Sequence, residues 1–284
     1  MNLGLDAAYV QRVVALALAE DIGPGDVTTL STIPETARCT AALNSRVEGV
    51  VAGLPVAIET FRQLDPDVQI EAHKHDGNAV RPGETLLTIR GRARAVLTAE
   101  RVALNFVQRM SGTATATAHF VAAVRGTRAK IIDTRKTTPG LRQLEKYAVR
   151  AGGGQNHRFG LFDGVLIKDN HIAASPDGIG GAILAARRGA PHSLRVEVET
   201  ENLDQVREAL AAGADAILLD NMSPDELREA VTMIDGRAVA EASGGVTLDT
   251  VRAVAEAGVD LISVGALTHS APALDLALDF TVEA

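Results

Sequence analysis

The second half of the chain alternates short apolar runs with amphipathic segments. From Ala129 onward the apolar runs read AKIID, GVLIK, LRVEVE, DAILLD, AVAEA and DLISVG, which have the length and composition of strands. Segments 202–214, 223–234 and 247–259, between the later runs, carry apolar residues at helical spacing. This alternation predicts βαβ units with parallel strands, and six strands are enough for a barrel-like closure that falls short of the usual eight.

The pattern before this region is mixed. It predicts a helix near the start and a helical region, 94–126, that Ser111 and Gly112 divide into two helices, with the domain boundary at this break. The other predicted elements are an alternating strand region, a short helix and an antiparallel hairpin, at 38–53, 54–64 and 75–91.

Composition adds limits to this picture. A chain of 284 residues with 46% hydrophobic residues, few aromatics and no Trp suits one large barrel, or a barrel with a smaller companion, around an aliphatic core. No apolar run approaches the roughly 18 residues of a membrane helix and the start lacks a basic leader, so we expect a cytoplasmic protein. Cys39 is the only cysteine and is predicted to be a small core residue.

A net charge of −8 argues against a broad nucleic-acid surface. The stretch AGGGQNHRFGLFDGVLIKDNH, residues 151–171, nevertheless gathers cationic and hydrogen-bond-donating groups. A local basic cleft in an acidic protein favours an anionic small molecule, so the expected partners are small molecules or further copies of this chain.

Polar, cationic or glycine residues follow every predicted strand. In barrel enzymes the active site is built at the carboxyl ends of the strands, and the agreement of all six ends weakens the alternative of ordinary solvated loops. The candidates are Thr134, Arg135, Lys136, Lys168, Glu199, Asp220, Ser243, Gly244, Gly245 and Gly265.

The basic candidates suit anion binding. Of the adjacent Arg135 and Lys136, one can grip a carboxylate with its planar fork while the other holds phosphate as a point charge; the alternative is a solvated basic turn. Lys168 is either a Schiff-base lysine or an electrostatic clamp. The clamp is favoured because an anionic substrate also explains Arg135, Lys136 and Arg158. The glycines of SGGVTLDT and VGALTHS favour a phosphate site over simple tight turns.

Glu199 and Asp220 end neighbouring predicted strands. Two carboxylates at the cavity mouth suit ribose hydroxyls or a Mg²⁺ carried in with substrate phosphates, and the alternative, that they only neutralise the lysines, stays open. Glu197 lies two positions earlier, so it faces the same way as Glu199 and is expected to support it.

The stretch DTRKTTPGLRQLEKYAVRAGGGQNHRFGLFDGVLIKDNH, residues 133–171, closely resembles the signature of the quinolinate phosphoribosyltransferases, the carboxylating nicotinate-nucleotide pyrophosphorylases. The pieces LTAERVALNFVQRMSG, VEVE, ILLDNM, ASGG and VGALTHS occur in the family's order, so the resemblance spans essentially the whole chain. A pyrophosphorylase associated with molybdenum transport is the nearest alternative, but it tends to lose the IKDNH ending that is intact here.

The resemblance implies an α/β fold with an N-terminal α/β sandwich domain, residues 1–111, followed by an open six-stranded α/β barrel, residues 112–270. Residues 271–284 are expected to pack back on the first domain. It implies at least a homodimer, in which Arg101 reaches into the partner's active site.

The resemblance also implies a role for each candidate. Quinolinate would be held by Thr134, Arg135, His157 and Arg158. Lys136 and Lys168 would face the pyrophosphate and the reacting centre, and Glu199 and Asp220 the ribose hydroxyls and Mg²⁺. The 5′-phosphate would lie against Ser243, Gly244, Gly245, Val264, Gly265 and Ala266. Asn170, His171 and His269 lie near the site without an assigned role.

The implied reaction joins quinolinate to 5-phosphoribosyl-1-pyrophosphate and gives nicotinate mononucleotide, pyrophosphate and CO₂, a step of NAD biosynthesis. Two other classes of function remain as alternatives. One is a Schiff-base lyase that uses Lys168, and the other is a non-catalytic metabolite-binding protein.

Overall fold

The computed structural model describes residues 4–282, which form two compact units. Among the described residues, the first unit comprises 4–118, 143–153 and 270–282, and the second comprises 119–142 and 154–269. Residues 1–3 and 283–284, which the predicted domain limits include, lie outside the described residues.

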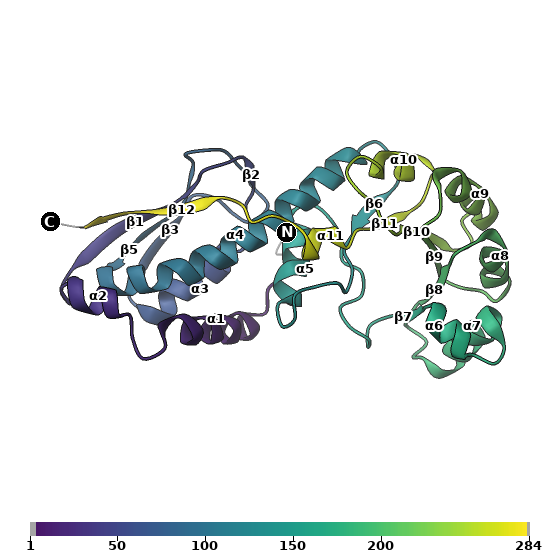
Figure 1. The fold of residues 1–284 in the computed structure, drawn as a ribbon, viewed down its shortest axis with the longest axis horizontal. Helices are drawn as coiled ribbons and strands as arrows, with labels where there is room; N and C mark the ends of the chain where they lie inside the picture. The colour runs from purple at the N-terminus through teal and green to yellow at the C-terminus, as the bar shows by residue number, and fades with distance from the viewer. Residues whose placement is uncertain (1–3, 283–284) are drawn as a thin grey trace. The chain divides into compact units, whose positions relative to one another are not determined.

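An antiparallel sheet with helices packed on it forms the first unit (Figure 1). The strand order is β12-β1-β5-β3, with a separate two-stranded pair, β2-β4. The strands are β1 (Arg38–Ser45), β2 (Gly49–Val50), β3 (Gln69–Ala72), β4 (Ala79–Val80), β5 (Thr85–Arg92) and β12 (Leu276–Val282). The helices are α1 (Ala7–Ile22), α2 (Val27–Thr32), α3 (Leu54–Leu64), most of α4 (Ala93–Ala123) and nearly all of α5 (Arg142–Ala151).

Strand β1 shows why this layer forms. Its buried residues alternate with more exposed ones, and the inward side chains of Cys39, Ala41 and Leu43 join a core that includes residues of α3 and α4. Cys39 is a buried core residue, as predicted. The last strand, β12, returns from the end of the chain to pair with β1, from Cys39 opposite Val282 to Ser45 opposite Leu276.

Two predictions for this unit are wrong. α4 runs unbroken through Ser111 and Gly112, because these small residues permit close packing and do not end the helix. The Ser111 hydroxyl hydrogen-bonds the backbone of Ala52, and a Cβ on Gly112 would lie 2.0 Å from the carbonyl oxygen of Pro272. The predicted hairpin over 75–91 is also absent from the described sheets: β4 pairs with β2, whereas β5 lies between β1 and β3.

The second unit is the predicted open α/β barrel. Its six parallel strands follow the order β6-β11-β10-β9-β8-β7, and no pairing between β6 and β7 closes the sheet within the described residues. The strands are β6 (Lys130–Ile132), β7 (Val165–Ile167), β8 (Val196–Thr200), β9 (Ala216–Asp220), β10 (Val239–Ser243) and β11 (Leu261–Ser263). The helices are α6 (Asp169–Ala174), α7 (Gly178–Gly189), α8 (Leu203–Ala211), α9 (Pro224–Ile234), α10 (Val251–Glu256) and α11 (Ala266–His269).

A buried carboxylate organises part of the first unit. Asp76 accepts hydrogen bonds from the backbone N–H groups of Gly53 and Leu54, at the start of α3, and from the Tyr147 hydroxyl at 2.6 Å. Burial raises the pKa of Asp76, while the hydrogen bond from Tyr147 opposes this rise. The carboxylate therefore depends on these donors for its charged form.

We expect Tyr147→Phe to lower the free energy of unfolding by about 2 kcal/mol, because a buried carboxylate loses a charge-assisted hydrogen bond. Without that donor the pKa of Asp76 rises further. A carboxyl whose pKa is raised on folding costs stability as the pH rises through that pKa, so the deficit is larger at neutral than at mildly acidic pH. Urea unfolding of both proteins at the two pH values measures it, and an equal deficit at both would contradict the role of Asp76.

Candidate active site

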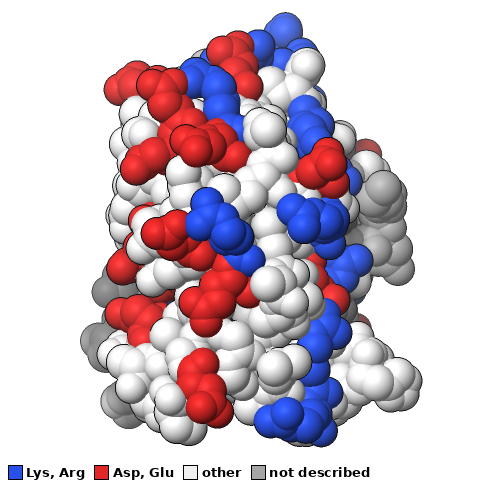
Figure 2. All heavy atoms as spheres, turned by 90° about the vertical axis from the view of Figure 1, so that its right-hand side faces the viewer, with Lys and Arg blue, Asp and Glu red and all other residues white. Residues whose placement is uncertain are grey.

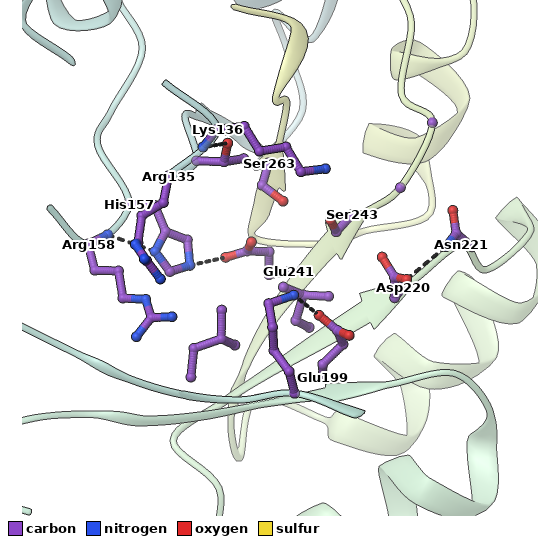
Figure 3. Close-up of a pocket in the computed structure, with 16 residues that line it drawn as sticks. Arg135, Lys136, His157, Arg158, Glu199, Asp220, Asn221, Glu241, Ser243 and Ser263 are labelled. Atoms are coloured by element: carbon purple, nitrogen blue, oxygen red, sulfur yellow. Dashed lines mark hydrogen bonds and ion pairs between the residues drawn. The ribbon is translucent and has the colours of Figure 1, made fainter. Parts of the chain in front are cut away.

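A crevice of about 540 Å³ lies at the carboxyl ends of the barrel strands in the second unit (Figure 3). Its lining includes these predicted residues: Thr134, Arg135, Lys136, His157, Arg158, Lys168, Glu199, Asp220, Ser243, Gly244 and Gly245. They come from segments far apart in the sequence, because parallel strands bring all their carboxyl ends to one edge of the sheet.

Four predicted residues do not line this crevice. Val264 is buried at the end of β11, and Ala266 is the first residue of α11. Gly265 lies behind Lys136, since a Cβ there would be 3.1 Å from Lys136 Cδ. Arg101 is exposed on α4 in the first unit. The predicted phosphate-binding role of Val264, Gly265 and Ala266 stays a prediction. So does the predicted role of Arg101 in the partner's active site.

Asp133 joins the two segments that carry most of the basic lining residues. Gln155 forms an isolated parallel bridge with Ile132, the last residue of β6. The buried Asp133 carboxylate then accepts hydrogen bonds from the His157 backbone N–H at 2.9 Å and from Asn156 Nδ2 at 2.6 Å. Through these bonds the loop after β6 and residues 155–158 are held in one frame.

We expect Asp133→Asn to disturb this frame, because a neutral amide has only one acceptor oxygen in place of two and loses the charge-assisted hydrogen bonds of the carboxylate. The cost is about 2 kcal/mol in the free energy of unfolding, the usual price of leaving a buried polar group unsatisfied. Thermal unfolding checks this effect. We also expect the variant to bind a pyridine dicarboxylate more weakly, because Arg135 and Arg158 lose their fixed spacing. Titration with that ligand measures the affinity. An unchanged affinity would contradict the role of Asp133 in holding the two segments together.

Arg135 and Arg158 form the cationic side of the crevice. Burial lowers the pKa of Arg158 most, and the positive charge of Arg135 lowers it further. Arg158 Nη1 donates a hydrogen bond to the Gly164 carbonyl at 3.0 Å. The buried Nε of Arg135 reaches no acceptor within the described part of the chain. Two neighbouring cations, one with an unused donor, are suited to an incoming anion.

Lys168 and the two strand-end carboxylates form the opposite side. Lys168 Nζ makes an ion pair with Glu199 Oε2. Glu199 and Asp220 come from the neighbouring strands β8 and β9, and Asp220 accepts a hydrogen bond from Asn221 Nδ2 at 2.7 Å. The crevice thus places carboxylates across from the arginines.

Ser243 is the last residue of β10, and Gly244 and Gly245 follow it at the edge of the crevice. Gly244 has a φ of +96°, and a Cβ there would lie 2.1 Å from Asn221 Oδ1. A side chain at that position would collide with Asn221, and Gly244 and Gly245 are both exposed. Exposed backbone N–H groups of this kind suit a phosphate.

Two family models match the chain. The model of the quinolinate phosphoribosyl transferase N-terminal domain matches residues 26–111, and that of the C-terminal domain matches residues 113–279. The chain belongs to the quinolinate phosphoribosyltransferase family. The resemblance found in the sequence is thereby confirmed.

Relatives within this family match along nearly the whole chain. The probable nicotinate-nucleotide pyrophosphorylase [carboxylating] of Bacillus subtilis is 49% identical over 267 residues, 93% of this chain and 90% of its own length. The Mycobacterium leprae nicotinate-nucleotide pyrophosphorylase [carboxylating] is 46% identical, covering 96% of this chain and 97% of its own. The solved structure of the nicotinate-nucleotide pyrophosphorylase from Francisella tularensis superposes with a TM-score of 0.92, at 41% identity over 98% of both chains.

Two carboxylates of the barrel, Glu197 and Glu241, lie beside the ring of His157, an arrangement that the sequence did not predict. Glu197 was expected to support Glu199, but its Oε2 lies 3.1 Å from His157 Nε2. Glu241, which was not predicted as a site residue, also lines the crevice, with Oε2 3.7 Å from the same nitrogen. The signal was present, because Glu241 precedes Ser243 by two positions, and alternate strand residues face the same side.

His157 has a defined hydrogen-bonding state. Its Nδ1 accepts the Arg158 backbone N–H at 2.7 Å, so in the neutral ring the proton lies on Nε2. That N–H points toward Glu197 and Glu241, as Figure 3 shows for Glu241. Both ring nitrogens therefore have protein partners. The predicted contact of His157 with a substrate carboxylate stays a prediction.

The helices outside the crevice carry charges of both signs. Figure 2 shows basic and acidic side chains in neighbouring columns on the face formed by α7, α8 and α9. Many of them pair locally, as in Arg187–Asp215 at 2.8 Å and Arg207–Asp204 at 2.6 Å. Exposed pairs of this kind contribute little to stability, and they indicate a solvated surface.

Proposed function

We propose that the crevice of the second unit binds quinolinate and 5-phosphoribosyl-1-pyrophosphate and converts them to nicotinate mononucleotide, pyrophosphate and CO₂. This is the carboxylating pyrophosphorylase activity for which the relatives are named, and it makes the chain a pentosyltransferase of NAD biosynthesis. The observation that carries the proposal is the grouping of Arg135, Lys136, Arg158 and Lys168 around one crevice, because both substrates are anions.

Quinolinate is assigned to the arginine side. Arg135 and Arg158 offer planar forks for its two carboxylates, and Thr134 adds a hydroxyl at the same edge. Each charge-assisted contact contributes about 1.5–3 kcal/mol. Nicotinate lacks one of the two carboxylates, so a site built for both discriminates against it.

The phosphoribosyl group is assigned to the other side. Glu199 and Asp220 accept from the ribose hydroxyls, the Ser243–Gly245 loop faces the 5′-phosphate, and Lys136 and Lys168 face the pyrophosphate. The support is their position around the crevice and the absence of a side chain at Gly244.

The oxygen donors at these strand ends fit Mg²⁺. It prefers carboxylate oxygens together with substrate phosphates and water, and Glu199 and Asp220 supply such carboxylates on neighbouring strands. We propose that these two residues hold it. When bound, Mg²⁺ would neutralise charge on the pyrophosphate.

The chemistry then needs few protein groups. The C1–O bond to pyrophosphate breaks, the lysines stabilise the negative charge on the leaving group, and the carboxylates of Glu199 and Asp220 stabilise the cationic ribose carbon. The pyridine nitrogen gives its electron pair to that carbon. The arginines hold the ring so that this nitrogen points toward the ribose.

Decarboxylation follows from the first step. Once the nitrogen carries the ribose, the ring is cationic, and the carboxylate on the adjacent carbon leaves as CO₂. The electron pair stays on that carbon beside the positive nitrogen until a proton arrives. The substrate stabilises this charge itself, so the protein mainly orients it.

The test is to supply carboxyl-labelled quinolinate, 5-phosphoribosyl-1-pyrophosphate and Mg²⁺, and to measure labelled CO₂ and nicotinate mononucleotide. Absence of both products would overturn the proposal and favour a non-catalytic binding protein. Borohydride treatment separates a Schiff-base lyase, which forms a reducible adduct. Lys168 is poorly suited to that chemistry, since its side chain is 46% exposed whereas Schiff-base lysines are desolvated.

The assembly and location remain proposals. We propose a homodimer in which Arg101, exposed on α4, enters the partner's site, as the family resemblance implies. The cytoplasmic location predicted from the sequence is retained. Separately, none of the described helices has both the length and the apolar character needed to cross a bilayer.

A further inference from the structure

Glu241 is a carboxyl group at the floor of the crevice that the mechanism above does not use. Its side chain is 2% exposed, yet it lines the cavity together with Arg135 and His157. Its Oε1 makes no hydrogen bond within residues 4–282. A buried carboxylate without full hydrogen bonding is costly when charged.

The groups around Glu241 divide by sign. Glu197 on β8 is a like charge, and Lys168 after β7 is an opposite charge farther away. His157 points its Nε2 at both carboxyls, and the Ser263 hydroxyl on β11 lowers the pKa of Glu241 while it donates to the Ala242 carbonyl at 3.4 Å. On β9 the residue opposite Glu241 is apolar Leu218, and Asp220 at the end of that strand adds negative charge. Arg135 supplies positive charge from the loop after β6.

Desolvation and repulsion therefore dominate at this position. Burial is the largest effect and raises the pKa of Glu241 well above the ordinary range, and the negative charge of Glu197 raises it further. Ser263 and Lys168 oppose this rise. Glu241 is thus uncharged at pH values at which an exposed glutamate has ionised. Above its raised pKa, the floor gains one negative charge.

We propose that Glu241 is a specificity-determining residue for quinolinate: while it is uncharged the crevice accepts a dianion, and when it ionises the dianion is rejected. This inference rests on the proposed function. The electrostatic penalty scales with the charge of the ligand, so quinolinate is affected more strongly than the monoanion nicotinate. Glu241 therefore makes the preference between a pyridine dicarboxylate and a pyridine monocarboxylate depend on pH.

The experiment is calorimetric titration of the full-length protein with quinolinate and with nicotinate, from mildly acidic to alkaline pH. In the wild type, we expect quinolinate affinity to fall roughly tenfold as the pH rises through the raised pKa of Glu241, and nicotinate affinity to fall less. Glu241→Gln keeps the size and the neutral state, so it removes this fall. Glu229→Gln, on exposed α9, loses a carboxylate elsewhere and keeps the wild-type profile.

A second variant does not depend on the folding of Glu241→Gln. Glu197→Gln removes the like charge that disfavours the charged form of Glu241, so the fall moves to lower pH. An unshifted profile in Glu197→Gln, or an unchanged fall in folded Glu241→Gln, overturns the inference while wild-type binding and CO₂ release still stand. Failure of the wild type to bind quinolinate or release CO₂ overturns the proposed function itself.

Discussion

Replacing Lys168 with methionine is expected to lower kcat by about a hundred- to a thousandfold, the usual loss when one preorganised charge is removed from an active site. Methionine keeps the apolar stem and removes the cation that pairs with Glu199, whose side chain is only 11% exposed. The leaving pyrophosphate then loses one of its positive partners. Steady-state measurement of CO₂ release gives the effect.

Lys74→Met is the matched control for this variant. Lys74 forms a 3.0 Å ion pair with Glu84 in the first unit and is not one of the residues that line the crevice, so we expect normal turnover. Glu199→Gln and the double variant complete a cycle. Because the two groups act as a unit, their effects are expected to be strongly non-additive. Turnover of Lys168→Met within a few-fold of the wild type would exclude a catalytic role for the lysine.

The second large effect is expected from Arg135→Ala, which should weaken quinolinate binding between about ten- and a hundredfold. The buried Nε of Arg135 reaches no acceptor among the described residues, so a substrate carboxylate is the partner that would satisfy it. Binding of 5-phosphoribosyl-1-pyrophosphate should persist, because its assigned contacts lie on the other side. Separate calorimetric titrations with the two substrates measure both values.

Arg228→Ala is the control for Arg135→Ala, since Arg228 pairs with Asp225 on the exposed surface of α9. It removes the same side chain from the second unit without touching the crevice lining. Equal loss of affinity for both substrates in Arg135→Ala would point to general damage. Unchanged quinolinate affinity would remove Arg135 from the carboxylate site.

The sequence predicted the barrel well because parallel strands leave a local signal. Each apolar run is short and ends in a polar or glycine residue, and all six runs are strands in the structure. The first unit was harder, because the neighbours of a strand in an antiparallel sheet are not a local property. The segment 79–92 has turn residues suited to a hairpin, but its two strands pair with other partners.

Ser111 and Gly112 show the same limit. Locally they are helix breakers, but Gly112 is required by the nearby Pro272 backbone, which is distant in the sequence. In the site, most of the strand-end residues that line the crevice were identified from the sequence, whereas Asn221 after β9 and Ser263 at the end of β11 were not. Asp133 and Glu241 were missed as structural elements of the site, because their importance comes from contacts with His157 and its loop.

The pairing of β12 with β1 also determines the order in which the protein can be completed during synthesis. β1 precedes the barrel in the chain, but the strand that covers its free edge, β12, is made only after all the barrel strands. Until then the N-terminal sheet has an unpaired edge, which can associate with other nascent chains. All six barrel strands of the described residues precede β12, so the barrel can fold before the N-terminal sheet is completed.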